Sequence, residues 1–136
     1  MRTRPRIVVD TNALVSRLLL PASVPAQAVR KAVDTSILLV AEATMNELAD
    51  VLARPKFDRY ISLEDRQQFL RLLGRLAELV PIVYPVHACR DPRDDKFLEV
   101  ALNGKAELIL TGDADLLALN PRQGIAIVSP ADYLKL

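Results

Sequence analysis

Acidic side chains in four separate parts of the sequence could carry out chemistry together. They are Asp10, Glu47, the pair Asp94 and Asp95, and the pair Asp113 and Asp115. Two carboxylates about 4 Å apart repel by roughly 4 kcal/mol at an effective dielectric constant near 20, so acids that share a pocket need protons or a cation. Donors that are all oxygen favour Mg²⁺ or Mn²⁺ over Zn²⁺. If the fold brings these acids together, we expect a divalent cation and hydrolysis of a phosphodiester, because dications make an acidic pocket attractive to phosphate.

Each of these acids also has a purely structural explanation. Asp10 precedes a predicted helix and could serve only as its N-cap. Asp94 and Asp95 at a helix start would favour the positive end of the helix dipole. Glu47 could be a solvated helix residue, and Asp113 an ordinary turn residue. Only convergence in one pocket separates a functional site from unrelated caps and turns.

The single cysteine and the single histidine narrow the chemistry further. They are Cys89 and His87. One cysteine cannot form a disulfide within the chain, and the two residues are too few for a zinc site built from cysteine and histidine. We therefore expect both to be packing or surface residues and a metal-activated water to be the nucleophile.

Charge is distributed unevenly, although the formal net charge is only +1. Residues 54–75 contain six basic and three acidic side chains, whereas residues 91–115 contain seven acids and three bases. A protein that simply coats nucleic acid would be basic throughout. The basic stretch could hold a phosphate backbone, but a solvated helix face also explains Arg66, Arg71 and Arg75. Three further arginines lie near the amino terminus: Arg2, Arg4 and Arg6.

Short apolar runs and helical spacing predict the elements that must position the acids. Strands are predicted at 7–9, 37–40, 82–84, 108–110 and 125–128. Helices are predicted at 13–20, 25–33, 41–53, 62–80, 94–103 and 130–134, with a helical turn at 116–117. Because helices and apolar strands alternate throughout, we expect an α/β fold with a doubly wound parallel sheet of about five strands.

This sheet would gather the acids at one edge. Asp10 closes the first strand, Asp113 follows the strand 108–110, and the helix that begins at Asp94 immediately precedes that strand. Ligands bind beyond the carboxyl ends of such strands. A chain of 136 residues is expected to form one domain over 1–136. No apolar run reaches the roughly 18 to 20 residues of a membrane span, so we expect a cytoplasmic protein.

Four motifs spread over nearly the whole chain resemble one known family. They are VVDTN at 8–12, EL at 47–48 followed by VLARPKF at 51–57, DPRDDKFL at 91–98, and TGDADLL at 111–117. In this order and at these separations they resemble the PIN-domain family. The resemblance is to its small single-domain bacterial and archaeal members, the VapC-like toxins of toxin-antitoxin pairs.

The resemblance implies a parallel sheet in the order 3-2-1-4-5 and a ribonuclease that depends on Mg²⁺ or Mn²⁺. Asp10 would be the first-strand acid, Glu47 the helix acid and Asp113 the acid after the fourth strand. Either Asp94 or Asp95 would be the third acid, and these residues together would form the metal site.

Further residues and partners follow from the same resemblance. Asn12 and Thr111 would orient the first acid and line the pocket, and Asp115 is a further candidate for the last acid. The implied partners are an RNA substrate, a small antitoxin protein and a second copy in a homodimer, with no membrane.

Other protein classes fit the motifs less well. A haloacid-dehalogenase-like phosphatase needs a second acid where this chain has Asn12, and a receiver domain needs a lysine where Ser129 follows the last strand. The remaining alternative is a PIN-like module that binds RNA or a protein without cutting.

Overall fold

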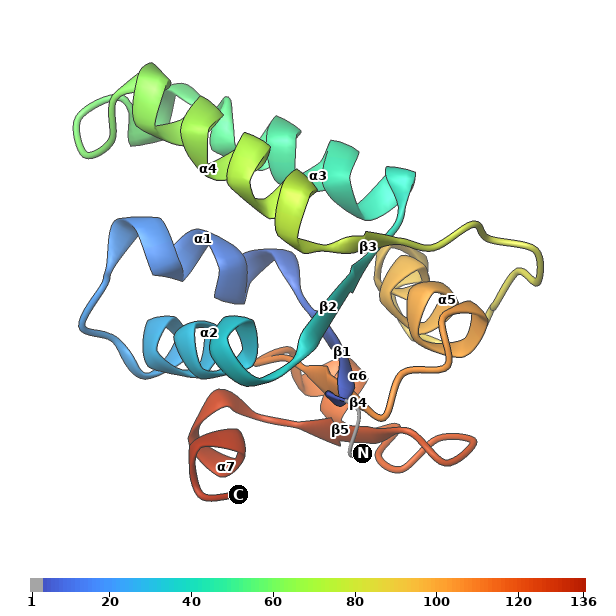
Figure 1. Ribbon diagram of the computed structural model, residues 1–136. Helices are drawn as coiled ribbons and strands as arrows, with labels where there is room; N and C mark the ends of the chain where they lie inside the picture. Colours follow the sequence, from blue (N-terminus) through green and yellow to red (C-terminus); the bar gives the residue numbers. More distant parts are fainter. Residues whose placement is uncertain (1–3) are drawn as a thin grey trace.

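Five parallel strands form the central sheet (Figure 1). The computed structural model describes residues 4–136. Arg2, one of the three arginines near the amino terminus, lies outside this range. The strands are β1 (Arg6–Val9), β2 (Ile37–Val40), β3 (Glu78–Leu79), β4 (Leu108–Leu110) and β5 (Ala126–Val128). Their order is β3-β2-β1-β4-β5 and every pairing is parallel. This confirms the predicted fold class and strand order.

Helices connect the strands and cover both faces of the sheet (Figure 1). They are α1 (Thr11–Leu19), α2 (Val24–Thr35), α3 (Glu42–Leu52), α4 (Leu63–Leu76), α5 (Asp95–Asn103), α6 (Ala114–Leu117) and α7 (Pro130–Leu134). Two short 3₁₀ turns, η1 (Pro55–Phe57) and η2 (Pro92–Asp94), precede α4 and α5. In each of the helix regions that the sequence predicts, the structure has a helix.

Polar side chains cap the amino ends of several helices, and one of them is Asp10, as the sequence predicts. The backbone N–H of Ala13 donates to Asp10 Oδ1 at 2.8 Å, and the N–H of Asp65 donates to Ser62 Oγ at 3.0 Å. The first N–H groups of a helix have no partner within it, so such caps fix where the helix starts. Asp10 is therefore a cap, which leaves open whether it is also part of a functional site.

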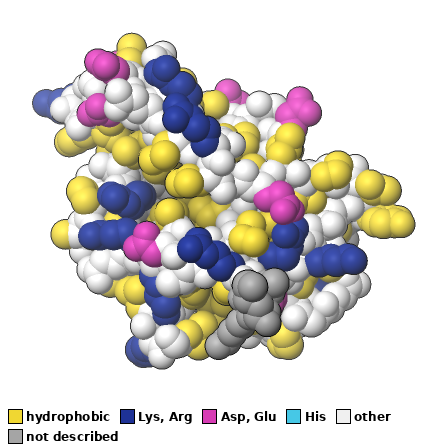
Figure 2. Space-filling model, in the orientation of Figure 1, with side chains coloured by type: hydrophobic (Ala, Val, Ile, Leu, Met, Phe, Trp, Pro, Cys, Tyr) yellow, Lys and Arg dark blue, Asp and Glu magenta, His cyan; other side chains and the backbone are white. Residues whose placement is uncertain are grey.

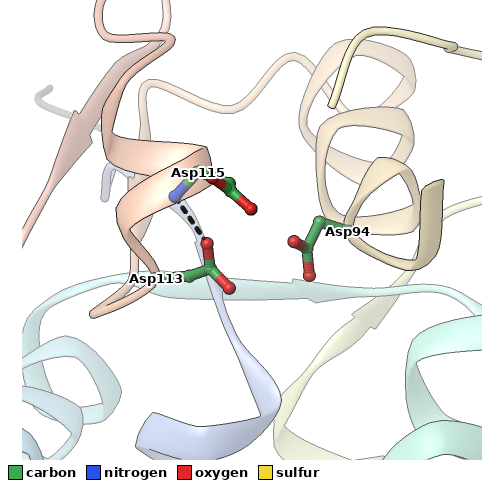
Figure 3. A group of neighbouring side chains, drawn as sticks. All are labelled: Asp94, Asp113 and Asp115. Carbon is green, nitrogen blue, oxygen red and sulfur yellow. Dashed lines mark hydrogen bonds between the residues drawn. The ribbon is translucent and has the colours of Figure 1, made fainter. Parts of the chain in front are cut away.

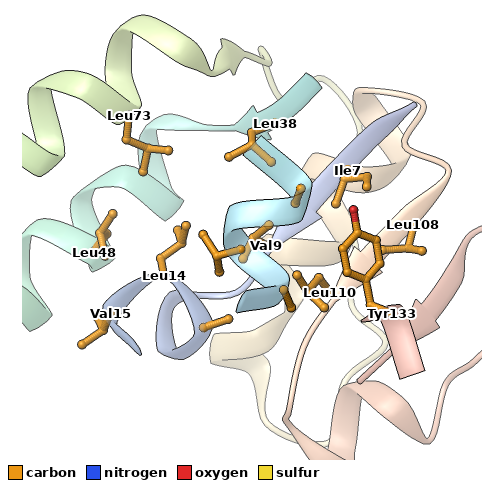
Figure 4. Close-up of a cluster of buried hydrophobic side chains, with 14 of the residues drawn as sticks. Ile7, Val9, Leu14, Val15, Leu38, Leu48, Leu73, Leu108, Leu110 and Tyr133 are labelled. Atoms are coloured by element: carbon orange, nitrogen blue, oxygen red, sulfur yellow. The ribbon is translucent and has the colours of Figure 1, made fainter. Parts of the chain in front are cut away.

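Alternating strand residues build two hydrophobic cores. Ile7 and Val9 of β1 face one core with residues from α1 to α4 and α7, drawn in Figure 4. Val8 faces the other core, where it packs with Phe97 and Leu98 of α5. Side chains of a strand point alternately to its two faces, so a strand covered on both sides is apolar throughout. Both cores anchor β1, whose carboxyl end carries Asp10.

The position predicted for the third strand was wrong. The sequence favours a strand at 82–84 and a helix up to residue 80, but α4 ends at Leu76 and the strand is Glu78–Leu79. These two residues pair with Leu39 and Val40 of β2. The chain meets β2 as soon as it leaves the helix, so the length of α4 decides which residues pair. Further along, the backbone N–H groups of Val83 and Tyr84 donate to the Asn103 side chain and these side chains stay exposed.

Arg66 is also not what the sequence suggests. It was expected on a solvated helix face or against phosphate, but its side chain is only 4% exposed. Its guanidinium donates to the carbonyls of Ile61 and Leu52 and to Asp58 Oδ1 at 2.7 Å. A buried charge requires such partners. Arg66 therefore fixes the loop between α3 and α4 and is not free to hold nucleic acid.

A close contact sets the position of α5. Gly104 caps its carboxyl end. A Cβ atom there would lie 2.8 Å from the Val100 carbonyl oxygen and 2.9 Å from the Leu39 side chain. Only glycine allows the helix end to approach β2 so closely. At the other end of α5, Asp94 lies in one pocket with Asp10, which follows β1.

Basic and apolar side chains share one face of the molecule. Lysines and arginines spread over the view in Figure 2, with hydrophobic side chains between them. An apolar groove with a volume of about 260 Å³ lies between α4 and the pair α1 and α2. Its apolar lining includes Leu14, Leu18, Val29, Val33, Phe69 and Leu72.

Within residues 4–136, no helix is both long and apolar enough to cross a membrane.

Candidate active site

Asp10 lies directly after β1, at the junction with β4. Its side chain is buried, with 5% of the residue exposed. Besides capping α1, it accepts a hydrogen bond from the Thr111 hydroxyl to Oδ2 at 2.6 Å. Burial raises the pKa of Asp10, while the bonds from Thr111 and the Ala13 backbone oppose that rise. The negative charge of Asp113 raises it further.

Asp113 lies beside Asp10 because β1 and β4 are neighbours. β4 pairs with β1 in parallel register, and the chain passes from β4 through Thr111 to Asp113. Asp113 Oδ1 accepts from the backbone N–H groups of Asp115 at 2.7 Å and Leu116 at 3.2 Å, which begins α6 (Figure 3). The Thr111 hydroxyl accepts from the Asp113 N–H at 3.0 Å. One buried threonine therefore links the two acids.

Asp94 approaches this edge from the start of α5. Figure 3 shows its carboxylate facing those of Asp113 and Asp115. One carboxylate oxygen from each of the three residues lies within 4.8 Å of the others. Burial, and then the charges of Asp113, Asp91, Asp115 and Glu47, raise the pKa of Asp94 from 3.8 to about 6. Three carboxylates at this spacing repel one another without a counter-ion.

Glu47 completes the acidic group from α3. The Thr11 hydroxyl donates to Glu47 Oε2, and the Lys96 ammonium donates to Oε1 at 2.7 Å. Its side chain is 28% exposed. Glu47 thus lies at the border of the buried helix face, and side chains from α1 and α5 hold its carboxylate.

These acids line one pocket with a volume of about 160 Å³. Its lining residues are Asp10, Thr11, Asn12, Glu47, Val51, Arg54, Asp94, Phe97, Asp113 and Leu116. The polar part of the wall is mainly carboxylate, and Val51, Phe97 and Leu116 provide apolar walls. The structure therefore brings together five of the eight residues suggested from the sequence, from four different parts of the chain.

The other three suggested residues have different positions. Thr111 is fully buried behind Asp10. Asp115 does not line the pocket, although it faces Asp94. Asp95 is 7% exposed and accepts from the backbone N–H groups of Ala88 at 3.0 Å and Cys89 at 2.8 Å. Burial opposes ionisation of Asp95, but these bonds outweigh it and lower its pKa.

The positions of Asp94 and Asp95 separate two roles that spacing leaves open. Asp94 faces the pocket, whereas Asp95 holds the loop that precedes α5. Cys89 in that loop is half-buried, and burial together with Asp95 raises the pKa of its thiol to about 12. Its sulfur is therefore a neutral thiol at neutral pH.

The pocket fits a hard divalent cation. The acids that line it, Asp10, Glu47, Asp94 and Asp113, offer only oxygen atoms as ligands. Asp94 and Asp113, together with Asp115 beside the pocket, bring one carboxylate oxygen each within 4.8 Å of the others. The raised pKa of Asp94 indicates negative charge that the described side chains leave incompletely balanced. A dication offsets such repulsion more strongly than single protons do.

Three side chains around the acids are not among the predicted site residues, although Arg54 belongs to the basic stretch 54–75 that could hold a phosphate backbone. Arg54 lines the pocket, and Thr11 and Lys96 hold Glu47. Each stands next to a recognised motif, but no spacing rule tells which side chain reaches across to another helix. A cation within a run of acids, as at Lys96, is the available signal.

Comparison with known proteins supports the resemblance. A family model described as PIN domain matches residues 6–115. An uncharacterized protein, MJ1680 of Methanocaldococcus jannaschii, is 30% identical over 118 residues, which cover 84% of this chain and 74% of that protein.

Solved structures share the fold at low sequence identity. VapBC2 from Rickettsia felis, bound to a promoter DNA fragment, has a TM-score of 0.61 at 10% identity and covers 91% of this chain and 98% of its own. PAE2754 from Pyrobaculum aerophilum has a TM-score of 0.62 at 17% identity, with coverages of 96% and 88%. The PIN domain endonuclease Utp24 has a TM-score of 0.55 at 18% identity, with coverages of 91% and 84%. With its sheet order and its matched family model, this chain belongs to the PIN domain family.

Proposed function

We propose that this protein is a nuclease that depends on Mg²⁺ or Mn²⁺ and cuts RNA internally. The observation that carries the proposal is the convergence of Asp10, Glu47, Asp94 and Asp113 in one pocket at the carboxyl ends of β1 and β4. PIN domains are usually nucleases, and one structure with the same fold is named an endonuclease. Membership of the family supports the hydrolysis of phosphodiester bonds. The chemistry of the pocket supports the dependence on a metal, and the motif resemblance supports RNA as the substrate.

The residues of the pocket would have separate tasks. The four acids would hold the cation, which when bound lowers the pKa of a water and neutralises phosphate charge. The Thr111 hydroxyl keeps Asp10 oriented toward the pocket. Arg54 at the rim would bind a non-bridging phosphate oxygen, and Asn12 offers an amide for the sugar or phosphate. Phe97 and Leu116 form apolar walls of the pocket.

The biological role we propose is that of a toxin in a toxin-antitoxin pair. The support is the motif resemblance and the shared fold of VapBC2, which was solved with promoter DNA. A small antitoxin would block the pocket, for example by inserting an arginine among the acids. We also propose a homodimer in the cytoplasm and one PIN-like domain over 1–136. Expression of the protein alone should arrest growth, and normal growth at high soluble expression would contradict the toxin role.

Replacement of Asp10 tests the catalytic proposal. D10N preserves shape and removes one negative charge, so the protein should fold while RNA cleavage with Mn²⁺ falls at least about a hundredfold. D50N is the matched control because Asp50 is exposed on the same helix as Glu47. Cleavage of a labelled RNA and thermal unfolding would be measured for both. A D10N protein that cuts at the wild-type rate would refute this active site.

The same experiment separates an enzyme from a binding module. A silent PIN-like module would bind RNA without cutting it at any Mn²⁺ concentration, and EDTA would change nothing. The proposed nuclease should lose cleavage in EDTA and regain it with Mn²⁺, but not in the D10N variant.

A further inference from the structure

Glu47 is the one pocket acid that a charged side chain holds in place, among the contacts of residues 4–136. Its Oε2 accepts from Thr11 at the start of α1, and its Oε1 accepts from Lys96 in the first turn of α5. We propose that Lys96 is a positioning residue that orients Glu47 and thereby sets the affinity of the pocket for its divalent cation. This inference rests on the proposed function and deepens it.

The geometry leaves Glu47 able to bind a cation while Lys96 holds it. An ionised carboxylate has about four lone-pair sites. Thr11 and Lys96 occupy one site on each oxygen, so each oxygen keeps one free. Lys96 itself does not line the pocket, although its ammonium contacts Glu47 Oε1.

Without Lys96, Glu47 would have other partners within its range. A glutamate on a helix has three rotatable side-chain bonds and here is partly exposed. Arg54 lines the same pocket, and the charge of Glu47 acts on Arg93. Lys96 is 23% exposed, and its ammonium connects α5 to Glu47 of α3, so it competes with these cations for the carboxylate.

Simple electrostatics predicts the opposite effect, and this makes the inference testable. If Lys96 were only a positive charge near the pocket, its removal would strengthen cation binding. If Lys96 orients a ligand, its removal should weaken binding by about ten- to a hundredfold, as for other hydrogen-bond partners of metal ligands. The sign of the change therefore distinguishes orientation from charge.

The experiment measures Mn²⁺ affinity without RNA, by electron paramagnetic resonance of free Mn²⁺, for the wild type, K96M, K96R and E47Q. We expect K96M to bind about ten- to a hundredfold more weakly and K96R to recover most of the loss. K135M is the matched control, because Lys135 is an exposed lysine near the carboxyl terminus. In an E47Q background K96M should cause no further loss, because Lys96 acts through Glu47.

Three other outcomes overturn the inference on Lys96, and one bears on the proposed function alone. Equal or tighter Mn²⁺ binding by K96M would mean that Lys96 only competes with the cation or only stabilises the fold through its ion pair. This holds even if the unfolding temperature of K96M falls. An equal loss in the E47Q background would mean that Lys96 acts elsewhere. Wild-type protein that binds Mn²⁺ but cuts no RNA would refute the proposed function and leave the Lys96 result readable. Wild-type protein that binds no Mn²⁺ would refute both.

Discussion

The two walls of the acidic pocket are built by different means. The strand wall consists of Asp10 and Asp113, which follow β1 and β4 and accept hydrogen bonds from backbone N–H groups. The helix wall consists of Glu47 and Asp94, which come from α3 and the start of α5. Glu47 depends on side-chain donors, and Asp94 makes no helix-capping hydrogen bond.

This difference separates a fixed part of the site from an adjustable part. Strand pairing and helix caps place the strand wall, so it cannot move without disruption of the sheet. The helix wall depends on a few side-chain contacts and on mutual repulsion, so substitutions or a bound cation should alter it more readily. We expect catalysis to need both walls, but stability and metal affinity to respond differently to changes in each.

The largest expected effect distinguishes neighbouring acids at the helix wall. D94N should reduce Mn²⁺-dependent RNA cleavage at least about a hundredfold, because Asp94 faces the pocket. D95N should cut RNA nearly as well as the wild type, because its side-chain oxygen can still accept from the N–H groups of Ala88 and Cys89. Single-turnover cleavage rates provide the measurement. An inactive D95N beside an active D94N would make Asp95 the third acid.

A substitution behind the strand wall should have the next largest effect. In T111V the hydroxyl that donates to Asp10 and accepts from the Asp113 N–H is lost at almost constant volume. We expect Mn²⁺ affinity to fall about ten- to a hundredfold. In the metal-free protein, the Asp10 oxygen and the Asp113 N–H that lose these bonds should also cost about 1–3 kcal/mol of unfolding free energy. Mn²⁺ titration and urea unfolding check both values, and unchanged affinity would remove Thr111 from the site.

The smallest expected effect is a pH dependence of the metal-free protein. The folded pKa of Asp94 is raised to about 6 from 3.8, so between these values the folded state binds more protons than the unfolded state. Stability should therefore fall as pH rises from about 4 to 6. The raised pKa of Asp10 acts in the same direction, while the lowered pKa values of Asp91 and Asp95 matter at lower pH.

Thermal unfolding in EDTA at pH 5 and pH 7 tests this dependence. Metal-free wild type should be more stable at pH 5 than at pH 7. D94N should show a smaller change in stability between the two pH values. Saturating Mn²⁺ should stabilise the wild type at pH 7 by mass action and stabilise D94N less. A wild-type stability that rises with pH over this range in EDTA would contradict the repulsion at the helix wall.

Much of the fold could be predicted because its signals are local. The apolar runs at 37–40 and 108–110 became strands with these bounds, and the caps at Asp10 and Ser62 begin helices. The third strand could not be placed in this way. Residues 82–84 are more strand-like than Glu78 and Leu79, but the end of α4 brings the latter beside β2. Tertiary position overrode local preference there.

The candidate site was predictable in its acids but not in its contacts. Strand ends place Asp10 and Asp113 together once the sheet order is known. Nothing local distinguishes Asp94 from Asp95 at a helix start, and Arg66 has the sequence context of a surface residue although it is buried. These outcomes depend on which way a side chain faces within a turn, which packing decides.

The sequence by itself determined which groups are available and roughly where the strands end, because caps, apolar periodicity and charge act between residues close in the chain. Only the tertiary structure decided that Glu47 meets Thr11 and Lys96, which are 36 and 49 residues away along the chain. Contacts of that kind depend on how helices pack across a sheet. The residue pattern of one helix does not predict how a neighbouring helix is rotated about its axis. The sequence shows that the acidic side chains are present, but only the folded chain brings them into one pocket.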